Sequence, residues 1–392
     1  MVLAGGSDVV VCAPTTVPYE RFSPHGTPYW FGRAIRALCD TAGIEPAGID
    51  GLAIASMTMA PDTAIGIVEH LGLSLRWMDQ PTVGGASGLV ALRRAVAAVA
   101  LGEAETVVCA GADTNRPGAF EGLIENFSLF SRDAVVPYGA GGPNGSFALI
   151  TQAFMRETGL EAADFGKLCA AQRENAAANP IALMRKPYTI EEYLASRLIA
   201  DPIRLLDCVM PCAGAEAFLV TTADRARALG LDGAAVLSSF ESYNDYPDDP
   251  VQTRGGWAAR AGELWDRAGL GPAEVDVVHS YDDYPAITAM QLRDLGFAAE
   301  GDIAGFIRSH TFTVAGSFPH NTSGGQLSTG QAGFAGGFLG VNETLRQLIG
   351  RPLGGSGAQV PGARTGLVSG FGMINYDRGL VSAAAVLEGR AA

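Results

Sequence analysis

The sequence predicts an α/β protein made of two similar halves. Short apolar runs alternate with amphipathic helical stretches along the 392 residues, which is the pattern of folds in which helices cover a sheet. A chain of this length exceeds one ordinary single-core domain, and a hydrophobic content of 48% is enough for two packed cores. We therefore expect one half over residues 1–232 and a second over residues 233–392.

The first half begins with an apolar strand and an amphipathic helix, which Gly43 ends. Apolar runs of strand length predict strands at residues 8–13, 49–56, 106–110 and 217–222. Helical periodicity predicts helices at residues 30–42, 63–71 and 86–102. Between residues 113 and 206 the pattern loosens into loops and helices, including one at 162–179, and an insertion of this kind is where a cover over a ligand would lie.

The second half repeats the cycle of strand and helix. We expect strands at residues 235–240 and 275–279, helices at 257–268, 286–295 and 331–348, and a hairpin-like end over residues 366–387. The chain is therefore expected to form two α/β halves with a break near residues 230–234, either as two domains or as one duplicated domain.

The charge and the cysteines exclude several classes of function. A formal net charge of −14 without any basic run argues against nucleic acid, because phosphate binding requires clustered Lys and Arg. The six cysteines are scattered without the spacing of a metal site, so we expect reduced thiols and no bound metal. No basic leader precedes the first strand and no apolar run is long enough to cross a bilayer, so a cytoplasmic location is the expectation.

Several local strings carry a resemblance to a known family. They are LCDTAGIEPAGIDGLAIAS and QPTVGGASGLVALRRAV in the first half, and HSYDDYPAITAMQLRDLGF and PHNTSGGQLSTGQAGFAGG in the second. With the order of elements, they resemble the thiolase superfamily, specifically its lipid-transfer-protein or sterol-carrier thiolase-like branch. The resemblance implies a five-layered α-β-α-β-α arrangement, a homodimer, and an acyl-CoA thioester as substrate, with no other bound cofactor.

The resemblance also shows which catalytic groups of the family are missing. The nucleophilic cysteine falls on Gly85, the histidine of the family's His-Asp-Cys-Phe string on Tyr281, and the histidine of its Gly-His-Pro string on Gln331. The late acid/base cysteine falls near Ser369. Because a thioester is attacked by a thiolate and glycine supplies none, we expect chemistry without an acyl-cysteine.

The remaining groups define candidate roles. The backbone N–H groups of Gly85 and Ala86 lie where a helix starts and could hold an oxyanion, with a plain tight turn as the alternative. Loss of the cysteine side chain would also enlarge the pocket. The Tyr281 phenol could serve as acid or base, unless it is a packed tyrosine with a satisfied hydroxyl.

Neutral polar groups follow in the second-half loop. Gln331 could donate to a thioester oxygen or cap the next helix, and His320 is either near the site or faces solvent. Alternation along an extended segment places Tyr281 and Asp283 on one side. The catalytic candidates are Tyr281, Gly85, Gln331 and Asn321, and the substrate-binding candidates are Ala86, Asp282, Asp283, His320, Ser323 and Gly324.

An oxyanion hole and a tyrosine without a nucleophile favour retro-aldol cleavage of a β-hydroxyacyl-CoA. Some cysteine-lacking members of the same branch are steroid side-chain aldolases that act with a small OB-fold, zinc-ribbon partner of the DUF35 type. The resemblance therefore implies a bulky, possibly steroid, acyl group and this partner too. Tyr281 matches one of their acid/base tyrosines, whereas a second, expected near Gln331, is not matched. The alternatives are a non-covalent acyltransferase or condensing enzyme and a non-catalytic acyl-CoA-binding subunit.

Overall fold

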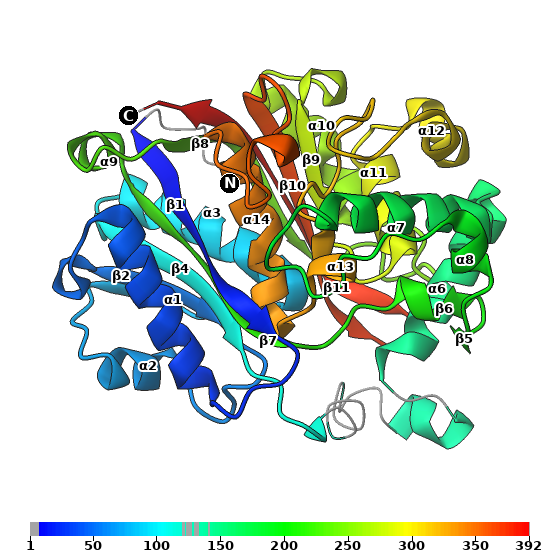
Figure 1. Ribbon diagram of the computed structural model, residues 1–392, viewed down its shortest axis with the longest axis horizontal. Coiled ribbons are helices and arrows are strands. Elements are labelled where there is room, and N and C mark those ends of the chain that lie inside the picture. Colours follow the sequence, from blue (N-terminus) through cyan, green and yellow to red (C-terminus); the bar gives the residue numbers. More distant parts are fainter. Residues whose placement is uncertain (1–7, 120–121, 123–127, 129–132, 140–141, 392) are drawn as a thin grey trace.

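A computed structural model describes residues 8–119, 122, 128, 133–139 and 142–391 (Figure 1). Its main feature is a nine-stranded mixed sheet in the order β3-β2-β4-β7-β1-β8-β11-β10-β9. These strands are β1 (Val9–Glu20), β2 (Gly51–Ala55), β3 (Trp77–Asp79), β4 (Thr106–Asp113), β7 (Ala213–Thr222), β8 (Gly233–Tyr243), β9 (Val277–Ser280), β10 (Thr365–Asn375) and β11 (Arg378–Arg390). A separate small ladder joins β5 (Leu198–Ala200) and β6 (Ile203–Arg204).

The helices occupy both faces of this sheet. They are α1 (Thr27–Ala42), α2 (Ala64–His70), α3 (Ser87–Ala100), α6 (Pro143–Thr158), α7 (Ala162–Ala176), α8 (Ile190–Leu194), α9 (Ala223–Ala228), α10 (Gly256–Ala268), α11 (Pro285–Asp294), α12 (Ile303–Ser309), α13 (Gly325–Thr329) and α14 (Gly336–Leu348). None of the helices that the structure describes has both the length and the apolar content needed to cross a lipid bilayer.

The two halves have the same topology. Read outward from the middle, the first half runs β1-β7-β4-β2 and the second runs β8-β11-β10-β9, and only the first half adds a further edge strand, β3. The halves meet where β1 pairs with β8 in antiparallel fashion at Val11 with Ala234 and at Cys12 with Gly233. The division into domains 1–232 and 233–392 stays a prediction.

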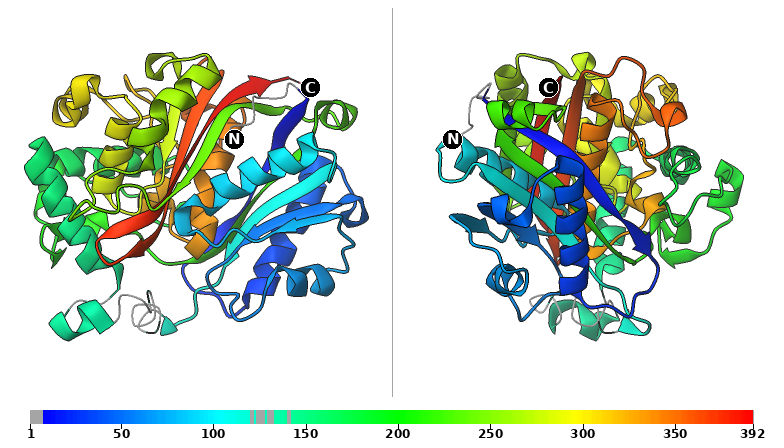
Figure 2. Two further views of the ribbon diagram at one scale, coloured as in Figure 1. Left: turned by 180° about the vertical axis from the view of Figure 1, so that it is seen from behind. Right: turned by 60° about the vertical axis from the view of Figure 1, so that its left-hand side comes forward.

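The layers follow from which apolar faces each helix covers. In the central layer, α3 and α14 pack against strands of both halves, so Leu92 and Val341 share one core with Val107 and Ala385. On the outer side of the first half, α1 and α2 cover the sheet, and α10 and α11 cover the second half (Figure 2). The expected five-layered α-β-α-β-α arrangement is confirmed, and the strands of the two halves are joined into one continuous sheet where β1 pairs with β8.

Most predicted elements lie within a few residues of the observed ones, and one helix begins later than expected. The helix predicted at 331–348 starts at Gly336. Gly330 and Gly333 have positive φ angles of 116° and 49°, which break a helix, so Gln331 lies instead in a short parallel bridge with Pro211. The edge strand β3 and the short helices α8, α12 and α13 were not predicted.

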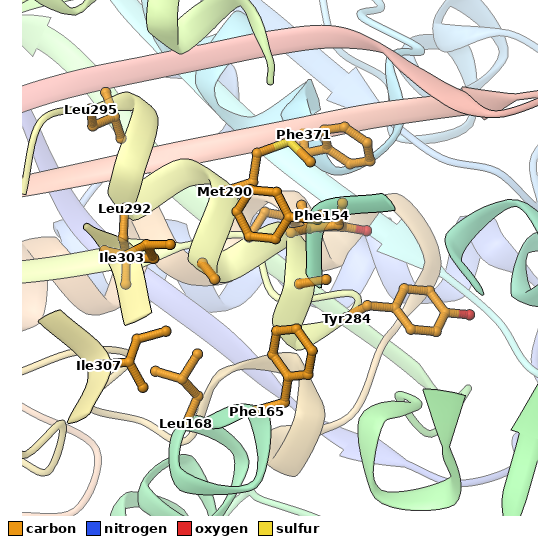
Figure 3. Packing of buried hydrophobic residues seen from close by; sticks show 14 of the residues in the cluster. Phe154, Phe165, Leu168, Tyr284, Met290, Leu292, Leu295, Ile303, Ile307 and Phe371 are labelled. Carbon is orange, nitrogen blue, oxygen red and sulfur yellow. The ribbon is translucent and has the colours of Figure 1, made fainter. Parts of the chain in front are cut away.

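The insertion between β4 and β7 packs on the second half. Helices α6 and α7 share a core with α10, α11 and α12. In Figure 3, Leu292 of α11, Ile307 of α12 and Leu168 of α7 point toward one another, and Tyr284 lies at the edge of the cluster with its hydroxyl directed away from it. The described part of residues 113–206 therefore packs on the second half, while part of it lies outside the described residues, and its role as a cover stays a prediction.

Asp113, at the end of β4, fixes one loop of the first half and one turn of the second half. Its fully buried carboxylate accepts hydrogen bonds from the Ser56 and Thr58 hydroxyls and from the backbone N–H groups of Met57, Thr58 and Phe334, at distances of 2.6–3.2 Å. Burial raises the pKa of Asp113, and these hydrogen bonds counteract the shift. The network joins the loop after β2 to the turn before α14.

Asp113→Ala is therefore expected to lower the free energy of unfolding by about 3 kcal/mol or more, because several buried donors lose their acceptor. Chemical denaturation of the variant, compared with Asp40→Ala at an exposed position of α1, measures this loss. Equal denaturation midpoints for the two variants would show that the loops hold without Asp113.

Candidate active site

A cavity of about 490 Å³ lies where the two halves and the insertion meet. Its walls are mostly apolar and come from the loop after β2, from α6, from the segment 197–211 and from the end of β10. Its polar end is made by Tyr281, Asp283 and Gln331, opposite the turn that contains Gly84 and Gly85. Such a cavity encloses a large apolar group and presents polar side chains at one end only.

Gly85 lies directly beneath the Tyr281 ring. The turn Gly84–Ala86 precedes α3. Gly84 has a φ of 60°, and a Cβ added to it would lie 2.8 Å from the backbone nitrogen of Met373, so only glycine fits there. A Cβ at Gly85 would lie 2.0 Å from Cζ of Tyr281, so the phenol ring fills the space of any side chain there. The expectation that the missing cysteine enlarges the pocket is thus wrong, because Tyr281 takes up the freed volume.

Tyr281, Asp283 and Gln331 form one hydrogen-bonded group. Nε2 of Gln331 donates to the Tyr281 hydroxyl at 3.1 Å and to Oδ1 of Asp283 at 2.5 Å. The backbone of Gln331 is itself held at both ends, since its N–H donates to Met210 and its carbonyl accepts from Cys212. The insertion therefore places the amide, and Gln331 does not cap a helix.

Burial governs protonation in this group. It raises the pKa of Tyr281 well above its ordinary value, and the nearby Asp283 carboxylate raises it further, so the phenol is protonated at neutral pH. Burial also raises the pKa of Asp283 to about 7, against the opposing effect of its interactions with Tyr281 and Gln331. At neutral pH the site thus contains a phenol that can donate and a carboxyl group that can gain or lose a proton.

Comparisons with known proteins show which family this chain belongs to. A family model described as "Thiolase C-terminal domain-like" matches residues 247–382. The chain is 35% identical over 332 residues to a 17-hydroxy-3-oxo-4-pregnene-20-carboxyl-CoA lyase of Mycobacterium tuberculosis, covering 80% of this chain and 84% of the relative. It is 30% identical over 335 residues to a steroid side-chain-cleaving aldolase of Thermomonospora curvata, covering 81% and 84%.

The chain belongs to the thiolase superfamily, in its lipid-transfer-protein branch. A solved structure titled "Ltp2-ChsH2(DUF35) aldolase" has the same fold, with a TM-score of 0.79 at 24% identity over 97% of both chains. A monomeric SCP2-thiolase-like protein from Mycobacterium smegmatis has a TM-score of 0.70 at 17% identity, covering 97% of this chain and 76% of that one.

In this thiolase-superfamily chain, the oxyanion hole expected at the start of α3 has one available donor. The Ala86 N–H donates to the Val83 carbonyl at 3.3 Å and is used within the turn. The Gly85 N–H makes no hydrogen bond to any residue that the structure describes, and Gly85 lines the cavity. Gly85 therefore keeps a candidate role in holding an oxyanion, whereas Ala86 is buried and does not line the cavity.

Asp282 and Asn321 support the catalytic loop from behind. The Asp282 carboxylate accepts from the backbone N–H groups of Gln326 and Leu327 at 2.9 and 3.1 Å, which caps α13. The Asn321 side chain pairs with both backbone groups of Ser280 at 3.0 and 3.1 Å, which fixes the strand end just before Tyr281. Asn321 was predicted to be catalytic and Asp282 to bind the substrate, and the structure places both outside the cavity.

The other predicted binding residues also lie away from the cavity. His320 is fully buried and does not face solvent: its Nε2 lies 2.8 Å from Oγ of Ser280, and burial lowers its pKa to about 3. Ser323 lines a separate void of about 20 Å³. Gly324, with a φ of 101°, leaves no room for a side chain, because a Cβ there would lie 2.5 Å from Cβ of Ala176. Close packing in this loop excludes a ligand.

The apolar lining could not be found from the sequence. Phe147 of α6 packs against Tyr284, with ring centroids 4.1 Å apart, and against Phe371 of β10 at 6.1 Å. The Tyr284 hydroxyl donates to Oδ1 of Asn144 at 2.6 Å, which joins α6 to the loop of Tyr281. Such residues look like ordinary core positions in the sequence, and only their meeting around one void marks them.

Within the described residues, no group of three or more His, Cys, Asp or Glu is placed to hold a metal ion.

Proposed function

We propose that this protein cleaves a bulky β-hydroxyacyl-CoA, of the steroid class, by a retro-aldol reaction that uses no acyl-enzyme. The observation that carries the proposal is the exchange at Gly85, where the Tyr281 phenol occupies the space of a nucleophilic side chain. Two relatives of at least 30% identity are a lyase named for a 17-hydroxysteroid carboxyl-CoA and a steroid side-chain-cleaving aldolase.

The cavity supports a substrate of this kind. A volume of about 490 Å³ lies within the range that encloses a drug-sized ligand. Its lining by Phe147, Phe334 and Phe371 favours a rigid apolar body, while the polar end receives the functional groups. A polycyclic acyl group with one hydroxyl and one thioester near its end matches this division.

The chemistry requires stabilisation of an enolate when the Cα–Cβ bond breaks. The protonated Tyr281 phenol can donate to the thioester oxygen as negative charge develops there, and the Gly85 N–H at the start of α3 can add a second donor. Both donors are present before the reaction, so little reorganisation is needed. No step requires a thiolate, in agreement with the sequence.

The same proposal includes the partners. A protein of the DUF35 type is proposed because the structure with a TM-score of 0.79 carries that partner in its title. Coenzyme A is proposed as part of the substrate, and Arg197, which lines the cavity, supplies a positive charge toward its phosphates. A homodimer, formed through the first half as in the family, is proposed as the core of the assembly.

The test uses the full chain, alone and copurified with a DUF35-type protein, and the probe 17-hydroxy-3-oxo-4-pregnene-20-carboxyl-CoA. The expected result is release of a free steroid ketone together with a shortened acyl-CoA, and mass spectrometry detects both products. Thioester binding without any product in either preparation would instead identify a non-catalytic acyl-CoA-binding subunit. Transfer of the acyl group to an added acceptor, with no ketone formed, would identify an acyltransferase.

A further inference from the structure

We propose that Asp283 is the general base of the reaction, and that Gln331 is a positioning residue that holds Asp283 and Tyr281 together. The inference rests on the proposed retro-aldol function and assigns its proton acceptor. Asp283 otherwise has only the role of a substrate-binding candidate. The base is an open question in this chain, because Gln331 carries an amide that cannot accept a proton at neutral pH.

The position of Asp283 meets the geometric requirement for a base. Its partly exposed side chain lines the cavity beside Tyr281. Oδ1 is held at 2.5 Å by the same Gln331 nitrogen that contacts the Tyr281 hydroxyl at 3.1 Å. One fixed amide thus sets the distance between a carboxylate and a phenol, which is the pair that proton removal and enolate stabilisation need.

The other groups around the cavity cannot serve as a base near neutral pH. Among the lining residues that the structure describes, Asp283 is the only carboxylate and there is no histidine. Burial raises the pKa of Tyr281 and of Tyr284 well above the ordinary value, and it raises that of Cys208 to about 12. Elimination therefore leaves Asp283.

Other buried carboxylates nearby are occupied with structure. The Asp282 oxygens cap α13 through Gln326 and Leu327. The Asp207 carboxylate accepts from the Tyr193 hydroxyl at 2.5 Å and from the Arg204 N–H at 2.7 Å. Asp283 differs from both in lining the cavity, where its hydrogen-bond partner is the Gln331 amide.

The proton balance closes on one carboxyl group. Asp283 takes the proton of the β-hydroxyl, the Cα–Cβ bond breaks as the oxygen becomes a ketone, and the electron pair moves into the thioester enolate. The enolate is held by Tyr281 while Asp283 returns the proton to Cα, so that nothing is oxidised or reduced. The β-oxygen is bonded to Cβ, and Cβ is bonded to Cα. Because only one carbon separates the two atoms, one carboxylate can reach both.

The charged and titratable groups that face Asp283 come from several elements. Asp282, Tyr281 and Tyr284 lie on the same loop, Cys208 approaches from the segment after β6, and Arg197 lines the same cavity. Asp282 raises the pKa of Asp283, whereas Tyr281 and Gln331 lower it by hydrogen bonding. Burial is the largest influence and leaves the pKa at about 7.

The experiment measures kcat/KM from pH 5.5 to 9 for wild type, Asp283→Asn and the exposed control Asp266→Asn. A base must be deprotonated, so the wild type is expected to gain activity with rising pH through about 7. Asp283→Asn is expected to lose at least about 100-fold in kcat/KM and to lose this rise. The control keeps both, and an Asp283→Asn enzyme with wild-type activity and pH profile would overturn the assignment.

Gln331→Met separates positioning from a purely structural role. Because the Gln331 hydrogen bond lowers the pKa of Asp283, its removal is expected to shift the rise in activity to higher pH. An unshifted profile, whatever the change in kcat, would overturn the positioning role of Gln331.

A readout without turnover distinguishes failure of this inference from failure of the proposed function. A carboxyl group whose pKa is higher in the folded than in the unfolded protein contributes its full stabilisation at a pH below its unfolded-state pKa. This contribution is lost as the pH rises through its folded-state pKa. The Tm of wild type minus that of Asp283→Asn should therefore fall between pH 5 and pH 8. If no substrate is cleaved, the role of Asp283 is tested by exchange of the Cα protons of a short acyl-CoA in D2O. Exchange by wild type and not by Asp283→Asn supports Asp283 as the general base, and any other result overturns this assignment.

Discussion

Tyr281→Phe is expected to reduce kcat by about 100-fold to 10,000-fold, because the variant keeps the ring over Gly85 and loses only the hydroxyl. The Tyr281 hydroxyl is protonated at neutral pH and lies within hydrogen-bond distance of Gln331 in the cavity. Without it, the enolate that forms when the Cα–Cβ bond breaks loses its strongest donor. Steady-state kinetics on the steroid thioester measure the effect.

Tyr243→Phe is the matched control for this change. Tyr243 is 48% exposed and its hydroxyl contacts Arg94 and Glu241 on the surface, away from the cavity. The control should match wild type in both activity and Tm. If Tyr281→Phe also kept kcat within about threefold of wild type, with a normal Tm, Tyr281 would have a packing role only.

Gly85→Ala is expected to abolish activity and to destabilise the fold. A Cβ would lie 2.0 Å from Cζ and 2.1 Å from Cε2 of Tyr281, so the phenol ring must move out of the site. Overpacking of a tight core costs about 1–3 kcal/mol, and the displaced hydroxyl no longer meets Gln331. Gly85→Cys is expected to fail in the same way and to gain no acyl transfer, because its sulfur would point into the same ring.

Two comparisons make this prediction specific. Gly48→Ala adds a Cβ that meets nothing within 4 Å, so it should leave stability and activity unchanged. In a Tyr281→Ala background, Gly85→Ala should lose most of its cost in unfolding free energy, since the clash is with that ring. A penalty of the same size in both backgrounds would place the strain elsewhere in the turn.

The two expected effects have one structural origin. Tyr281 follows β9 of the second half, and Gly85 precedes α3 of the first half, so the reactive centre forms only where the halves meet. Gly88 of α3, where a Cβ would lie 2.2 Å from the Gly337 carbonyl of α14, shows how closely the central helices approach. Small residues in this layer let the two halves come together around the cavity.

Much of the fold could be predicted from the sequence alone. The alternation of strands and helices, the insertion within the first half and the repeated order of elements depend on local periodicity, which each segment carries in its own residues. The helix predicted to begin at Gln331 began at Gly336, because the periodicity of the segment does not reveal that Gly330 and Gly333 adopt positive φ.

The candidate site was predictable in part. Position 85 is where the resemblance places the family's nucleophilic cysteine, and glycine there supplies no thiol whatever the other side chains do, so the sequence by itself determined that this position cannot form an acyl-cysteine. It also indicated Tyr281, Asp283 and Gln331 as groups of interest. It could not separate these from Asp282, Asn321 and His320, since neighbours in the same loop differ only in which way they face.

Only the tertiary structure decided what replaces the nucleophile. The ring of Tyr281 fills the space above Gly85, the backbone of residues 210–212 orients Gln331, and burial brings the pKa of Asp283 to about 7. Each of these properties depends on groups far apart in the chain, because van der Waals contact and desolvation are set by what surrounds a side chain and not by its neighbours in sequence.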